Sequence, residues 1–182
     1  FMFYRPNSEK AASLLWNAEK KFLRDSLDAA LYGTPDGSYG FIYIATTYGH
    51  TPPGKLASLY AGVIYLLKGK SDSAINFLEK ANPEDLILKY YLKGTIARAY
   101  LDNGSIDKSV HYLQEAIQSP DPYFVAPHFL FLLGRIKEMQ NKWRDALTCY
   151  KMIKKNYPLS EEAKQIDKYI ARVSAKLGIN IE

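Results

Sequence analysis

The sequence predicts an all-α protein, a solenoid built from antiparallel helix pairs. Two observations lead to this prediction. Three stretches repeat the same small and turn residues at offsets of 35 and 37 residues, and such periods are typical of helical repeats. Between the turns, apolar residues recur at the period of an amphipathic helix. A chain of 182 residues that is 47% hydrophobic can bury a continuous core across stacked units.

The first unit, 7–52, is expected to be a degenerate repeat. Its first helix is predicted over 9–26, where apolar residues follow the helical period. Its second helix is interrupted by the loop 32–38, which is rich in Gly, Pro, Asp and Ser, and resumes over 39–49. We therefore predict that this loop is a tolerated insertion.

Three complete units are expected at about 55–87, 88–122 and 123–158. Each has a small residue where two helices would cross, a turn residue seven positions later, and a second small residue in the next helix. Small residues at these points let the helices approach closely. The aligned residues are Gly62, Ala97 and Gly134, then the turn residues Gly69, Gly104 and Asn141, then Ala74, Ser109 and Ala146.

The last segment, 159–177, is expected to be a capping helix that covers the final repeat. Ser160 is a suitable N-cap, and Glu161 and Glu162 would favour the first turn. Gly178 marks the expected end of the helix.

The pattern over about 55–158 resembles the tetratricopeptide repeat (TPR). Lys137, Ser109 and Ile153 depart from that family's signature. The resemblance implies one domain over 1–182, a right-handed superhelix, and a non-enzymatic scaffold that binds a peptide or protein segment in its concave groove. The matching residues are Gly62, Tyr65, Gly69, Ala74, Leu78 and Ala81, then Ala97, Tyr100, Gly104, Leu113 and Ala116, then Leu133, Gly134, Ala146, Tyr150 and Pro158.

The same resemblance implies where the groove would lie, because the first helix of each TPR pair lines the concave face. An apolar floor with Arg98 and Arg135 would suit a peptide that carries apolar anchors and an acidic group. The alternative is that the first unit or the capping helix already fills the groove. The implied groove residues are Tyr91, Arg98 and Asp102 in the second repeat and His128, Phe131, Arg135 and Glu138 in the third.

The stretch 49–56, GHTPPGKL, nearly matches the phosphate-binding P-loop. Pro52 and Pro53 would remove two backbone N–H donors from the cradle, and Leu56 cannot bind Mg²⁺. We therefore expect no nucleotide binding. We interpret the stretch as a turn in which Gly49 follows one helix and the prolines break the chain before the next.

Other functions find little support in the composition. The three histidines are scattered, so no metal or other cofactor is expected, and the single cysteine, Cys149, falls inside a helical pattern as a small core residue. The net charge is +5, but acidic and basic residues are interspersed almost throughout and no dense Lys/Arg run with interleaved aromatics appears, so no nucleic-acid partner is expected. Self-assembly is the alternative function, and an enzyme or an RNA-binding repeat is a weaker one.

The location is predicted from a second resemblance. The interrupted first repeat and the sequence YIAR (169–172) resemble bacterial membrane-anchored TPR proteins. In these an N-terminal transmembrane helix holds the repeats on the extracytoplasmic side. The aromatic start FMFYRP would suit the end of such an anchor. A cytoplasmic location is the alternative.

Overall fold

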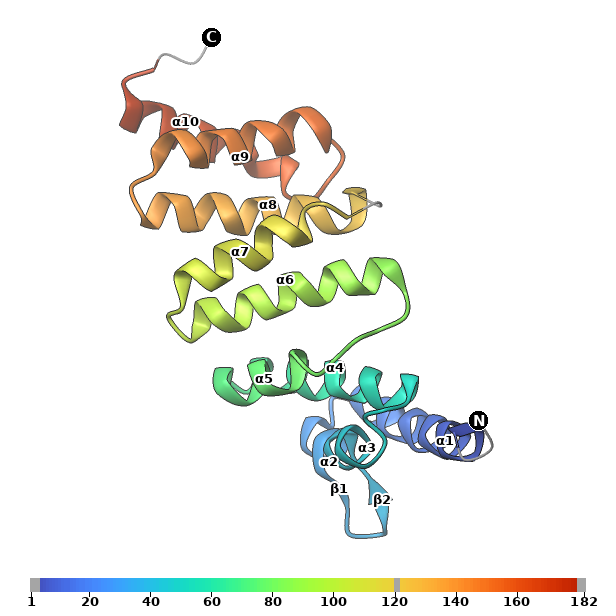
Figure 1. The fold of residues 1–182 in the computed structure, drawn as a ribbon. Helices are drawn as coiled ribbons and strands as arrows, with labels where there is room; N and C mark the ends of the chain where they lie inside the picture. The colour runs from blue at the N-terminus through green and yellow to red at the C-terminus, as the bar shows by residue number, and fades with distance from the viewer. Residues whose placement is uncertain (1–3, 120–121, 180–182) are drawn as a thin grey trace.

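The computed structural model describes residues 4–119 and 122–179, and it is an all-α solenoid (Figure 1). The helices stack in chain order, so that α1 and α10 lie at opposite ends of the stack (Figure 1). The elements are α1 (Tyr4–Phe22), α2 (Leu27–Tyr32), β1 (Gly33–Thr34), β2 (Ser38–Tyr39), α3 (Phe41–Thr47), α4 (Pro52–Leu67), α5 (Ser71–Leu78), α6 (Leu86–Asp102), α7 (Ile106–Ala116), α8 (Pro122–Met139), α9 (Trp143–Asn156), a 3₁₀ turn η1 (Ala163–Gln165) and α10 (Ile166–Leu177).

Consecutive helices form pairs. α4 packs on α5, α6 on α7, and α8 on α9, and α10 then packs on α9. The first helices of neighbouring pairs also contact one another, α4 with α6 and α6 with α8, while α1 contacts α4. One side of the solenoid is therefore formed by first helices alone.

The predicted small residues lie where paired helices cross. A Cβ atom on Gly62 would lie 2.5 Å from Cγ of Leu78, and one on Gly134 would lie 2.5 Å from Cε1 of Tyr150. Ala97 is fully buried. The helices of each pair are thus close enough that a larger side chain at these positions would overpack the core.

The interrupted first repeat contains a short hairpin that the sequence did not predict. β1 and β2 pair antiparallel, with Thr34 opposite Ser38. The Lys21 ammonium of α1 donates to Thr34 Oγ1 at 3.0 Å and also to Ser38 Oγ. The predicted loop is therefore attached to α1, and the two halves of the broken helix, α2 and α3, both contact α1.

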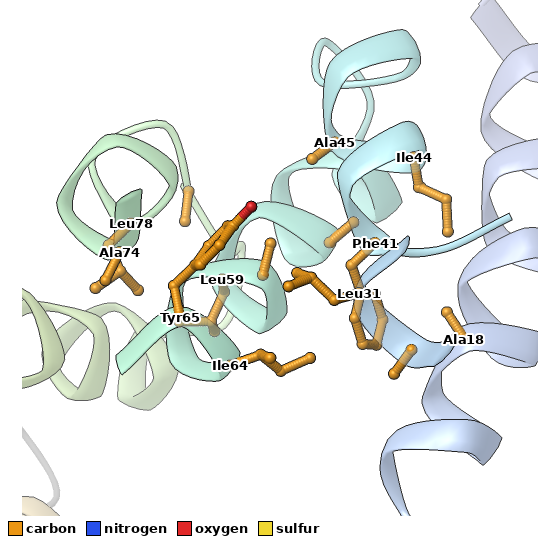
Figure 2. Packing of buried hydrophobic residues seen from close by; sticks show 14 of the residues in the cluster. Ala18, Leu31, Phe41, Ile44, Ala45, Leu59, Ile64, Tyr65, Ala74 and Leu78 are labelled. Atoms are coloured by element: carbon orange, nitrogen blue, oxygen red, sulfur yellow. The ribbon is translucent and has the colours of Figure 1, made fainter. Parts of the chain in front are cut away.

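The core of the N-terminal half lies between α1, the broken helix and the α4–α5 pair. Figure 2 shows Leu31 and Phe41 between Ala18 of α1 and the side chains of α4. Phe41 is fully buried, and its ring stacks on Tyr60 with centroids 4.7 Å apart. Burial of these large side chains holds the irregular first unit against the regular pairs.

The stretch 49–56 is a turn between helices, as predicted, but the prolines do not lie before the second helix. Pro52 and Pro53 are the first residues of α4, where a missing N–H costs nothing. Thr51 is the N-cap, and its Oγ1 accepts from the Gly54 N–H at 3.2 Å. A Cβ atom on Gly54 would lie 1.8 Å from the Tyr48 carbonyl oxygen. Gly54, the second glycine of the P-loop-like motif, therefore allows the close approach of the chain in a tight turn.

The capping helix begins later than predicted. Ser160 Oγ accepts from the Ala163 N–H at 3.2 Å, but this bond caps the turn that leads into η1. α10 begins only at Ile166, because Gln165 has a non-helical backbone with φ −123° and ψ 5°. The predicted end is confirmed, since Gly178 is left-handed with φ 66°.

Parts of two predictions lie outside the described residues. These are 1–3 of the aromatic stretch FMFYRP and 120–121 near the end of the second repeat. Among the helices of the described chain, none has the length and apolar character needed to cross a bilayer.

Candidate functional site

A cavity of about 250 Å³ lies on the side formed by first helices, between α4, α6 and α8. We call it the three-helix cavity. Its walls from α4 and α8 are mainly apolar, and its polar groups come mainly from α6. The lining residues are Val63, Leu66, Leu67, Tyr91, Gly94, Thr95, Arg98, Asp102, His128, Phe129 and Leu132.

Gly94 allows the apolar wall to form. A Cβ atom at this position would lie 1.9 Å from Cζ of Phe129, so α6 can receive the Phe129 ring only because residue 94 has no side chain. Phe129 is 4% exposed, and its ring lies 6.3 Å from that of Tyr91. Neither Gly94 nor Phe129 was predicted as a site residue from the sequence. A glycine inside a helix, which costs about 1 kcal/mol relative to alanine, was the available signal.

Arg98 and Asp102 supply the charged edge of the three-helix cavity. Arg98 Nε donates to both carboxylate oxygens of Asp102, at 3.0 and 3.1 Å. The Arg98 side chain is 58% exposed, and its two terminal nitrogens make no hydrogen bond to the described residues. This edge can therefore donate to an acidic or carbonyl group of a ligand, while Asp102 lowers the net charge.

His128 lies at the α8 side of the cavity and connects it to the segment before α10. Its Nδ1 is 3.5 Å from Oε1 of Glu162, and its side chain is 65% exposed. Its ring also makes an edge contact with Phe129, with centroids 5.2 Å apart. His128 is thus both accessible and close to the buried wall.

The structure separates the seven predicted groove residues into two groups. Tyr91, Arg98, Asp102 and His128 line the three-helix cavity. The other three are Phe131, Arg135 and Glu138.

This second group contacts α10. The Tyr169 ring makes an edge contact with Phe131 at 4.8 Å, and the Arg135 guanidinium lies 5.8 Å from the same ring. Arg172 binds Glu138. In the third repeat, the capping helix α10 therefore contacts the predicted groove positions, as in the alternative given above. The three-helix cavity lies beside these positions.

Glu138 binds α10 to the α8–α9 pair. Its carboxylate accepts from the Tyr150 hydroxyl at 2.5 Å and from Arg172 Nη2 at 2.6 Å and Nε at 3.1 Å. The Glu138 side chain is only 11% exposed. Burial and the hydrogen bond to Glu138 raise the pKa of Tyr150 above its ordinary value, and the same carboxylate raises the pKa of Arg172. These contacts assign Glu138 a structural role.

The candidate metal ligands and the single thiol were also located among the described residues. Within 4–119 and 122–179, no three His, Cys, Asp or Glu side chains are grouped as a metal site would require. Cys149 is buried, and burial raises the pKa of its thiol to about 11. A thiol with so high a pKa is protonated at neutral pH and is a weak nucleophile.

Comparisons with known proteins support the repeat interpretation. Models of the tetratricopeptide repeat match residues 90–120 and 129–160. The chain is similar in structure to crystallised nearly identical TPR-like repeats of a Podosopora anserina protein named for kinesin light chain, and to a point variant of those repeats. Each match has a TM-score of 0.59 and 14% identity, and covers 96% of this chain and 86% of the other. No curated protein matches the sequence. The predicted repeats are matched over these two stretches, and the predicted all-α solenoid is confirmed.

Proposed function

We infer that this chain, whose residues 90–120 and 129–160 match models of the tetratricopeptide repeat, is a protein-interaction scaffold. It binds a segment of a partner protein in the three-helix cavity. One observation carries the proposal. Three successive first helices, α4, α6 and α8, together line one cavity with an apolar wall and a charged edge. Apolar pockets with a few convergent polar groups are the usual form of a binding site.

The size of the cavity supports a peptide anchor as the ligand. Its volume of about 250 Å³ lies below the ~300–1,000 Å³ typical of sites for small molecules. It suits one or two apolar side chains of a peptide, inserted between Leu66 of α4 and Leu132 of α8. An acidic group beside that anchor would reach Arg98, whose terminal nitrogens can bind a carboxylate.

A selection of displayed random peptides against the immobilised protein tests this function. Leu67→Arg places a long cation at the rim of the cavity, at a side chain that is already 63% exposed. Leu159→Arg is the matched control, because Leu159 is 88% exposed, lies in the connection after α9 and does not line the cavity. Folding of both variants is checked by circular dichroism.

We expect the selected peptides to contain a large apolar residue next to an acidic one. Their affinity should fall at least about tenfold on Leu67→Arg and stay unchanged on Leu159→Arg. Arg98→Ala should weaken the acidic peptides more than their amide counterparts. Peptides that bind the wild type and Leu67→Arg equally would contradict the proposal, because their site would lie outside the cavity.

A further inference from the structure

The net positive charge of the protein is concentrated at its C-terminal end. Residues 142–178 contain nine Lys and Arg but only four Asp and Glu. This excess of five equals the net charge of +5 of the whole chain, so the rest of the sequence is neutral in sum. An asymmetry of this kind produces a local field that attracts acidic partners.

The clearest part of this charge is a row of cations along η1 and α10. Four side chains follow one another at intervals of four residues, and the three that lie on α10 are about 6 Å apart along the helix axis. All four are exposed. Within the row, Glu161 pairs with Lys164 at 2.5 Å and Glu138 pairs with Arg172, while Asp167 pairs with Lys154 of α9. The row consists of Lys164, Lys168, Arg172 and Lys176.

α10 also has the register of a first helix, and no second helix pairs with it among the described residues. Gly178 is left-handed with φ +66°, like Gly69 with φ +68° and Gly104 with φ +82°, which end the first helices α4 and α6. In α4 and α6, the small residue at which the second helix crosses lies seven positions before this glycine. The equivalent position of α10, seven residues before Gly178, is Ala171.

The crossing position on α10 is uncovered. The equivalent residues Gly62, Ala97 and Gly134 are all buried, whereas Ala171 and its neighbour one turn later, Ala175, are exposed. Within the described residues, no helix follows α10. Two small side chains one turn apart would let another helix approach the α10 backbone closely.

We propose that the face of α10 around Ala171 and Ala175 docks an amphipathic, acidic helix of a partner protein. The small residues supply the close contact that a second helix makes in every other pair. Lys168, Arg172 and Lys176 border this face and would pair with carboxylates on the incoming helix. The site is separate from the three-helix cavity and does not depend on the function proposed for it.

The aromatic groups near the row favour a helix over a nucleic acid. The Tyr169 ring is contacted by Arg172 at 4.8 Å and by Phe131 at 4.8 Å, and the Trp143 ring has Lys176 at 5.9 Å. Bases would need free aromatic faces for stacking. Since these rings already have partners, the cations and alanines are the groups that a ligand can use.

A synthetic helical peptide tests the proposal by fluorescence anisotropy on the complete chain. The probe has about 18 residues, roughly five turns, with a stripe of Leu and Ala and with Glu on both sides of it. A second peptide carries Lys in place of Glu. Ala171→Gln fills the crossing position with a side chain that helices accept readily, and Lys168→Glu reverses one charge. Ala12→Gln, at an exposed alanine of α1, is the matched control.

We expect the Glu peptide to bind, the Lys peptide not to bind, and the affinity to fall in higher salt. Ala171→Gln and Lys168→Glu should each weaken binding at least about tenfold, while Ala12→Gln and the cavity variant Leu67→Arg should leave it unchanged.

Equal binding to Ala171→Gln and to the wild type would overturn the proposal. A second result would also overturn it. If phosphatidylserine vesicles or an oligonucleotide compete with the peptide, and Ala171→Gln does not change their binding, then the row of cations attracts any polyanion. If Ala171→Gln fails to fold, Lys168→Glu becomes the deciding variant, and an unchanged affinity of this variant for the Glu peptide would overturn the proposal.

Discussion

Glu138→Ala should destabilise the protein, although the family resemblance placed Glu138 in a binding groove. The substitution leaves the hydroxyl of Tyr150, a fully buried residue, without its acceptor, which costs about 1–3 kcal/mol. It also removes the ion pair with Arg172, whose side chain is 47% exposed, so this loss adds only about 0–1 kcal/mol. The expected total is about 1–4 kcal/mol.

Urea unfolding followed by circular dichroism measures this loss as a lower midpoint at an unchanged slope. Asp102→Ala is the control, because it removes an exposed pair with Arg98 within one helix and should cost about 0.5 kcal/mol or less. Glu138→Gln keeps an acceptor for Tyr150 and should fall between the two. If Glu138→Ala costs no more than Asp102→Ala, the structural role assigned to Glu138 is wrong.

Three further outcomes are expected. Gly94→Leu should displace the Phe129 ring and cost about 1–3 kcal/mol in the same urea assay; an unchanged midpoint would mean that α6 and α8 are not in close contact. The thiol of Cys149 should not react with a disulfide reagent at pH 8 until the protein unfolds, and fast reaction in the native state would disprove its burial. The hydrogen bond to Glu79, together with burial, raises the pKa of Tyr100 to about 12 from 10.0, so the unfolded chain ionises first. The contribution of the Tyr100 hydroxyl to the free energy of unfolding is therefore complete below pH 10 and is lost as the pH rises from 10 to 12. Tyr100→Phe should reduce this loss of stability at high pH.

The sequence was most informative where one residue decides the local structure. The left-handed turns at Gly69 and Gly104, and the crossings at Gly62 and Gly134, follow directly from the absence of a side chain. These positions recur, so their spacing predicted the helix pairs and their order.

The sequence was less informative where a contact joins distant segments. The hairpin held by Lys21 depends on a contact with α1 that no local pattern records. The same holds for the candidate site. Tyr169 and Arg172 of α10 contact Phe131 and Glu138 and so decide which predicted groove residues are accessible. They lie more than 30 residues later in the sequence than the residues they contact.

Binding of a partner segment between α4, α6 and α8 can be observed residue by residue. The most direct test is a titration of a selected peptide into the ¹⁵N-labelled protein, with amide shifts followed by NMR. We expect the largest shifts around the cavity, at Leu67, Thr95 and Leu132. Shifts confined to the second helices, such as those of Lys108 on α7 or Lys151 on α9, would contradict it.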